Sequence, residues 1–179
     1  MKKIIGFTLV ELLTAIAVMM LLLMIGMPAW HHLTLSNRAT AALNQVVGLI
    51  NLARSEAMSR GVTVSLCQSA TKKSCDGNWQ NGQIIFLTKS EGVLEILHVG
   101  NEINGGKIRW QGFGEVAMLQ MMPTGFTAEQ NGSFIFCPNN GDVRYARAIF
   151  ISKTGRIRHS EDKDQDGIHE DADGKPLTC

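Results

Sequence analysis

Two arginines near the C-terminal end of the chain have a spacing suited to binding a polyanion. Arg156 and Arg158 alternate along an extended segment, so we expect their side chains on one face, about 6.5 to 7 Å apart. This distance is comparable to the phosphate spacing along a DNA strand, and guanidinium groups bind phosphate oxygens well. Gly155 precedes them and permits a tight turn that exposes both. A solvated strand face is the alternative that the charges alone leave open.

The charges around these arginines are strongly segregated, although the formal net charge of all 179 residues is only +1. Residues 142–159 carry five basic side chains and one acidic side chain, a net charge of +4. Residues 160–179 carry seven acidic and two basic side chains, a net charge of −5. The basic set is Arg144, Arg147, Lys153, Arg156 and Arg158. Only Tyr145 and Phe150 accompany it as aromatic residues, so we expect contact with the backbone of duplex DNA rather than base stacking.

The acidic segment contains the spacing of a calcium-binding loop. Residues 162–173 match the pattern D-x-D-x-D-G and supply oxygen atoms at the later positions of such a loop. The expected ligands are Asp162, Asp164, Asp166, the carbonyl of Ile168, Glu170 and Asp173. Asp173 stands where a longer, bidentate Glu is usual, and no flanking helices are predicted, so a flexible acidic tail is the alternative. A bound Ca²⁺ would cancel negative charge beside the arginines and favour DNA binding.

The four cysteines are typical of a domain in an oxidising compartment. Three pairings are possible, and the sequence does not choose among them. We expect Cys67 to pair with Cys75, which closes a short polar loop, and Cys137 to pair with Cys179, which ties down the C-terminal end. A zinc site is disfavoured because the chain has no C-x-x-C pair and no nearby pair of histidines.

Catalytic chemistry has little support in the sequence. The histidines form no recognisable triad or metal motif, and signatures of a Ser or Cys nucleophile are missing. The histidine positions are His31, His32, His98, His159 and His169. We therefore expect a protein that is not an enzyme and has no cofactor other than calcium.

The first thirty residues predict a membrane anchor. Lys2 and Lys3 mark the cytoplasmic side of an apolar stretch over residues 7–30, close to the roughly 20 residues that span a bilayer. Glu11 lies inside this stretch, where a carboxylate costs about 2.5 to 3.5 kcal/mol, so it is a candidate functional residue. Its expected partner is an amine, such as a freed α-amino group of Phe7 on a neighbouring copy. A simple anchor with Glu11 near the headgroups is the alternative.

The remaining elements predict an α+β fold. Residues 31–61 continue the helix with one apolar stripe, and Gly61 after Arg60 is a plausible C-terminal cap. The stripe consists of Ala39, Ala42, Leu43, Val46, Leu49, Ile50, Ala53 and Ala57. Strands are expected at 62–67, 83–87, 93–99, 107–110, 116–122, 133–137 and 147–152. An antiparallel sheet packed on the amphipathic half of the long helix is the simplest layered solution.

The residues from Gly6 to Glu11 resemble the prepilin peptidase recognition motif of type IV pilins and type II secretion pseudopilins. The resemblance implies cleavage after Gly6 by a prepilin peptidase and N-methylation of Phe7. It also implies that Glu11 sets the subunit register in a filament of pilin subunits. The family's fold is a long N-terminal helix packed against an antiparallel sheet, in agreement with the expected elements.

The head is similar to the FimT and GspH class of minor pilins and pseudopilins. The similar segments lie at 79–86, 122–126 and 149–158. Residues 155–158 resemble the G-R-x-R motif of FimT-type minor pilins, which bind DNA during natural transformation. This resemblance assigns the DNA contact to Arg156 and Arg158. Arg144, Arg147 and Lys153 would add supporting charge.

Together these features predict five segments and one function. The segments are a leader peptide (1–6), a transmembrane helix (7–30), an amphipathic helix (31–61), a β-rich head (62–159) and an acidic tail (160–179). We expect an inner-membrane protein with a periplasmic head that reaches the pilus or cell surface after assembly and binds double-stranded DNA for uptake. The alternative function is a structural minor pilin or pseudopilin that primes or caps a filament without binding DNA.

Overall fold

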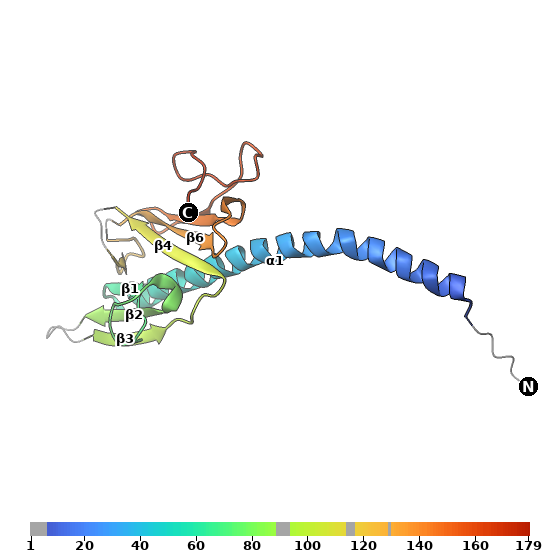
Figure 1. Cartoon of the computed structure of the whole chain (residues 1–179). Helices are drawn as coiled ribbons and strands as arrows, with labels where there is room; N and C mark the ends of the chain where they lie inside the picture. The colour runs from blue at the N-terminus through green and yellow to red at the C-terminus, as the bar shows by residue number, and fades with distance from the viewer. Residues whose placement is uncertain (1–6, 89–93, 114–116, 129) are drawn as a thin grey trace, which may run out of the picture. The chain divides into compact units, whose positions relative to one another are not determined.

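The computed structural model describes residues 7–88, 94–113, 117–128 and 130–179 (Figure 1). The chain divides into two units, Met1–Ser36 and Asn37–Cys179. One α-helix, α1 (Leu9–Arg60), contributes residues to both units. The candidate site lies in the second unit, which contains all of the strands.

In the first unit, α1 is long and apolar enough to cross a membrane. The described apolar side chains from Phe7 to Met27 are exposed, as expected for a helix whose natural surroundings are lipid or other helices. This unit therefore fits a single-pass membrane anchor, in agreement with the expectation for residues 7–30.

A capping box begins α1. The backbone N–H and the hydroxyl of Thr8 both donate to Oε2 of Glu11, at 3.0 and 2.9 Å. In return the backbone N–H of Glu11 donates to the Thr8 hydroxyl at 3.2 Å. This reciprocal pattern satisfies backbone donors that the first turn of a helix otherwise leaves without partners. Glu11 therefore also has a role within its own chain, which the expectation of an intermolecular partner did not include.

In the second unit, α1 presents one apolar stripe to the core. All eight residues of the predicted stripe are buried. The helix ends as predicted, because Gly61 adopts φ +67° and its N–H donates to the Ala57 carbonyl at 3.0 Å. A salt bridge between Glu56 and Arg60 supports the last turn. The amphipathic pattern therefore predicted this part of the helix correctly.

The strands form two four-stranded antiparallel sheets rather than one (Figure 1). The first sheet contains, in spatial order, β3 (Leu94–Val99), β2 (Gln83–Thr88), β1 (Val64–Gln68) and β5 (Leu119–Met121). The second contains β4 (Gly106–Gly112), β6 (Gly132–Pro138), β7 (Arg147–Ile151) and β8 (Ile157–His159). Each of the predicted strands matches an observed strand, with ends that differ by a few residues. Val93 and Val116, where two runs were expected to start, lie outside the described residues.

An aromatic cluster lies in the core between the strands and α1. Trp79 belongs to the short 3-10 helix η1 (Trp79–Asn81) and meets Phe134 of β6 edge to face, with ring centroids 4.7 Å apart. Trp110 of β4 packs on the same Phe134 at 4.5 Å. Such pairs contribute beyond their buried area. They connect η1 to the inner face of the second sheet.

Residues 160–179 fold back onto the second sheet. Leu177 is only 3% exposed and packs with Ile135, Ala146 and Ala148. An isolated bridge pairs Glu170 with Pro176. The acidic segment thus has defined contacts with the head in this structure.

Both expected disulfides are present. Cys67 pairs with Cys75 across a sequence separation of 8, and Cys137 pairs with Cys179 across a separation of 42. The first closes the polar loop after β1, and the second joins the C-terminal residue to β6. The sequence-based pairing is confirmed.

Candidate functional site

The turn between β7 and β8 presents the two arginines. Gly155 adopts φ +74°, and its N–H donates to the Ser152 carbonyl at 2.9 Å. The Ser152 N–H donates to the Arg156 carbonyl at 3.0 Å, and the Arg156 N–H donates to the Ser152 hydroxyl at 3.2 Å. A Cβ on residue 155 would lie 2.7 Å from the Gly125 carbonyl oxygen. Glycine is therefore required by both backbone conformation and space.

Arg156 and Arg158 line one shallow hollow of about 410 Å³. The other lining residues are Asn131, Phe150, Ile151, Ser152 and Thr154. The Arg158 guanidinium lies over the Phe150 ring, 5.5 Å from its centroid. The spacing in the sequence predicted that both arginines share a face, and the structure places them so. Within the described part of the chain neither guanidinium pairs with a carboxylate, so both charges are available to an external anion.

The three supporting cations are not gathered at this hollow. Arg144 forms a salt bridge with Asp142 at 2.6 Å, which raises the pKa of Arg144. Arg147 is half-buried and donates to the carbonyls of Arg144 and Ala146 at 2.8 and 2.7 Å. Burial lowers the pKa of Arg147. Lys153 is exposed in the turn itself. Of the three, Lys153 alone has its charge free at the turn that carries the arginines.

Three of the six candidate calcium ligands converge. Carboxylate oxygens of Asp162, Asp164 and Asp166 lie within 4.8 Å of one another. Oδ2 of Asp162 accepts from the Gly167 N–H at 3.0 Å. Oδ1 of Asp162 is buried and has no hydrogen-bond partner among the described residues. A hard cation with oxygen ligands suits such a cluster, because it would satisfy this oxygen and relieve the repulsion between carboxylates.

The remaining candidate ligands have other contacts. Glu170 is 6% exposed, and both of its carboxylate oxygens accept from the Lys163 N–H, at 3.2 and 3.0 Å. Asp173 is exposed and its N–H donates to Asp171. The Ile168 N–H donates to Asp166. The structure thus assembles the first half of the predicted loop and uses Glu170 to fix its backbone.

The acidic loop is attached to the sheet through Ser160. The Ser160 hydroxyl accepts from the Ala148 N–H at 2.9 Å and contacts Nδ1 of His169 at 3.0 Å. Nδ1 also lies 2.8 Å from the Ser160 carbonyl. Burial, with the nearby charge of Arg147, lowers the pKa of His169. The His169 ring thus joins the loop to Ser160, which directly follows the strand that carries Arg158.

The processing residues are only partly described. Gly6 lies outside the described residues, Phe7 is exposed, and Glu11 takes part in the capping box. The T-x-x-E spacing of Thr8 and Glu11 was a readable signal for this cap.

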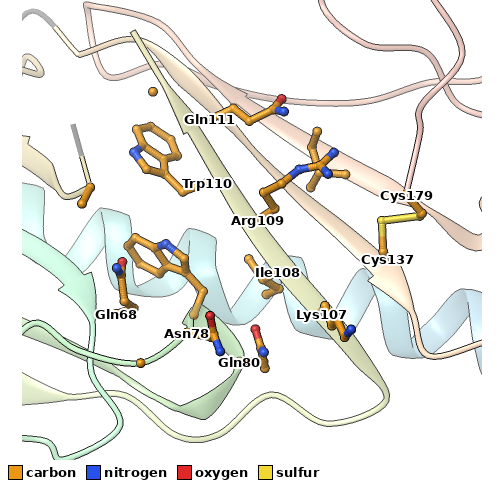
Figure 2. A pocket seen from close by; sticks show the side chains of 15 residues that line it. Gln68, Asn78, Gln80, Lys107, Ile108, Arg109, Trp110, Gln111, Cys137 and Cys179 are labelled. Carbon is orange, nitrogen blue, oxygen red and sulfur yellow. A yellow bond between two sulfur atoms is a disulfide. The ribbon is translucent and has the colours of Figure 1, made fainter. Parts of the chain in front are cut away.

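A groove of about 910 Å³ that was not predicted from the sequence lies along β4, as Figure 2 shows. One side is formed by six consecutive residues, Lys107 to Gly112. Gln68, Asn78, Trp79 and Gln80 contribute the other side. These residues are far apart in the chain and meet only after the two sheets form, so no local pattern indicated them.

The apolar N-terminal helix, the burial of its second half in the head and the antiparallel sheets define a type IV pilin-like protein. Residues 42–155 match the family described as Type II transport protein GspH, and the chain belongs to this family. The match ends before Arg156, so the arginine pair and the acidic loop follow it. No curated protein sequence matches the chain significantly.

Solved structures show the same fold. The chain is similar to the type IV minor pilin FimU of Pseudomonas aeruginosa, with a TM-score of 0.58 and 22% identity over 80% of this chain and 96% of that chain. A second crystal form of FimU gives a TM-score of 0.54 and 21% identity over 78% of this chain and 98% of that chain. The minor pseudopilin EpsH of the Vibrio cholerae Type 2 Secretion System gives a TM-score of 0.52 and 8% identity over 68% of this chain and 95% of that chain. These similarities show that the chain has the fold of these pilin-like proteins.

Proposed function

We propose that this minor pilin binds double-stranded DNA through Arg156 and Arg158 and serves DNA uptake in natural transformation. The observation that carries the proposal is the hollow between β7 and β8, where both guanidinium groups lie without carboxylate partners among the described residues. The hydroxyls of Ser152 and Thr154 lie 2.8 Å apart and line the same hollow. Arginine forks and hydroxyls are the usual contacts to phosphate oxygens.

The chemistry of the hollow favours the DNA backbone over the bases. Phe150 is covered by the Arg158 guanidinium, so its ring is not offered as a stacking platform. Phosphate contacts position a protein on DNA without reading sequence. We therefore expect binding with little sequence preference and a strong dependence on salt.

A titration of fluorescent duplex DNA with the full chain in detergent micelles tests this proposal. We expect Arg156→Ala plus Arg158→Ala to weaken binding strongly. Lys72→Ala plus Lys73→Ala removes the same charge from the exposed loop closed by Cys67 and Cys75, and should leave most of the affinity. Equal losses in the two double variants would reject the site, because they would reflect net charge alone.

The second candidate is a structural subunit that primes or caps a filament. Membership of the GspH family and the similarity to a pseudopilin favour it. Pilin-like proteins interact with other pilin subunits. A structural role in the filament is therefore compatible with DNA binding, but it does not require DNA binding. Failure of the wild-type chain to bind DNA at low salt would leave this role as the function.

We also propose that Asp162, Asp164 and Asp166 hold Ca²⁺. The convergence of their oxygens and the buried, unpartnered Oδ1 of Asp162 support the site. Titration calorimetry of the full chain in chelator-treated buffer should give heat that Asp164→Asn removes. Glu161→Gln changes an exposed carboxylate of the same segment outside the cluster and serves as the control. Heat that is the same in both variants would rule out the loop.

A further inference from the structure

The groove along β4 follows an edge of the second sheet. β4 is the first strand of its sheet and has β6 as its one strand neighbour among the described residues. Two hydrogen bonds flank the β4–β6 ladder: the Phe113 N–H donates to the Asn131 carbonyl, and the Asn139 N–H donates to the Gly105 carbonyl. Hydrogen-bonded pairs alternate in an antiparallel ladder. The backbone groups of Ile108 and Gly112 therefore point away from β6, toward the groove.

The opposite side of the groove offers amide groups to a guest. Figure 2 shows Gln68, Asn78 and Gln80 across from the β4 residues. Oε1 of Gln68 is buried and has no hydrogen-bond partner among the described residues. A buried acceptor without a donor is costly, so a rotation of the Gln68 side chain that brought this oxygen to an N–H group of a guest would be favourable.

The charged side chains that line the groove have one sign. Lys107 and Arg109 line it from alternate positions of β4, so both side chains lie on the same face of the strand. Arg109 donates to the Thr178 carbonyl at 3.2 Å, which holds its guanidinium over this face. Among the described lining residues there is no Asp or Glu. The groove thus complements a guest with carboxylates at every second position.

We propose that this groove binds an extended, acidic segment of another polypeptide, which adds as a strand to the outer edge of β4. Strand addition satisfies the outward backbone groups of Ile108 and Gly112, and alternate carboxylates of the segment then lie opposite Lys107 and Arg109. The site is separate from the hollow that contains Arg156 and Arg158. It gives the subunit a contact to a neighbouring protein that does not involve α1.

Polypeptide is favoured over nucleic acid by the backbone of β4. A row of alternating N–H donors and C=O acceptors matches another β-strand, whereas phosphates offer acceptors alone. The tryptophans do not form open stacking platforms, because Trp79 is 5% exposed and Trp110 packs on Phe134. Duplex DNA is therefore the competitor to exclude in the test.

The probe is the peptide acetyl-Thr-Glu-Val-Glu-Val-Glu-Thr-amide, titrated against the full chain in detergent micelles. We expect it to bind, and we expect a peptide with Lys in place of Glu to bind about tenfold more weakly or worse. N-methylation of one alternate set of backbone amides should abolish binding, while methylation of the other set should be tolerated. This asymmetry is specific to strand addition and is measured on the unaltered protein.

A charge swap tests the two cations. Lys107→Glu plus Arg109→Glu should reverse the preference, so that the Lys peptide binds better than the Glu peptide. Lys153→Glu plus Arg156→Glu changes the charge equally outside the groove and should retain the original preference. The proposal is overturned if the Glu peptide does not bind, if both methylated peptides behave alike, if the swap leaves the preference unchanged, or if duplex DNA displaces the peptide from the wild-type chain.

Discussion

The guanidinium of Arg158 lies 5.5 Å from the centre of the Phe150 ring, and the two residues are direct partners across β7 and β8. The contact extends the arginine side chain across the neighbouring strand. Because Phe150 also lines the hollow, it positions a cation there without being a phosphate ligand itself.

We predict that Phe150→Leu weakens DNA binding about two- to fivefold, the range expected for losing an exposed cation–π contact. Leucine preserves much of the apolar volume, so the fold should survive. Fluorescence anisotropy with duplex DNA measures the effect. The same substitution in the Arg158→Ala background should have little further effect; a full additional loss there would contradict a role through Arg158.

Gly155→Ala should destabilise the head by at least about 2 kcal/mol, because alanine at a left-handed φ is strained and its Cβ would collide with a backbone oxygen. Gly141→Ala provides a matched control: residue 141 has φ +71°, but a Cβ there meets no atom within 4 Å. We expect Gly141→Ala to lower the free energy of unfolding by about 1 kcal/mol. Urea unfolding of both variants measures the difference, and equal losses would show that the Gly125 contact is unimportant.

Asp76 should make the head sensitive to acid. Hydrogen bonds from the hydroxyl and backbone N–H of Thr71, with Ser74 and Ala70, lower the pKa of Asp76 to about 2 from its ordinary 3.8. A depressed carboxyl pKa stabilises the fold above the unfolded value of 3.8, and this stabilisation is lost as the pH falls toward 2.

The measurement is urea unfolding of the wild type and Asp76→Asn between pH 5 and pH 2. The stability advantage of the wild type should be constant above about pH 4 and shrink below it. If the free energies of unfolding of the wild type and Asp76→Asn differed by the same amount at every pH from 5 to 2, the lowered pKa of Asp76 would be contradicted.

Glu11→Val should leave membrane insertion intact and lower incorporation into filaments, if the carboxylate sets register between subunits. Thr8→Val separates this role from capping, because it removes the hydroxyl of the capping box and keeps the acid. We expect the Thr8 variant to incorporate nearly normally, as measured by immunoblotting of sheared filaments. Poor incorporation of both variants would assign the defect to the helix cap instead.

Local patterns in the sequence predicted the elements well. The eight-residue apolar stripe of α1 depends only on helical periodicity, and every member is buried. The end of the helix at Gly61 is equally local. The expected disulfides are both present, but the Cys137–Cys179 bridge joins residues 42 apart, and the sequence did not choose among the three possible pairings. The Thr8–Glu11 cap was equally local and could have been predicted from its spacing.

Pairing between distant segments was less predictable. The strand pattern did not show that residues 100–105 carry the chain from one sheet to another, so one sheet was expected where two exist. The side-chain orientations of Arg144 and Arg147 are set by Asp142 and by nearby carbonyl groups. A count of charges along the sequence does not take these contacts into account. The β4 groove requires η1 and β4 to meet, and a linear pattern contains no signal for that.

The salt dependence of DNA binding tests the central claim most directly. The logarithm of the binding constant should fall linearly with the logarithm of salt concentration, with a slope of about −0.9 for each phosphate contact. For the full chain in detergent micelles, Arg156→Ala plus Arg158→Ala should therefore make the slope shallower by about 1.8. An unchanged slope in this double variant, beside a wild-type chain that binds DNA, would contradict the assignment of the two arginines.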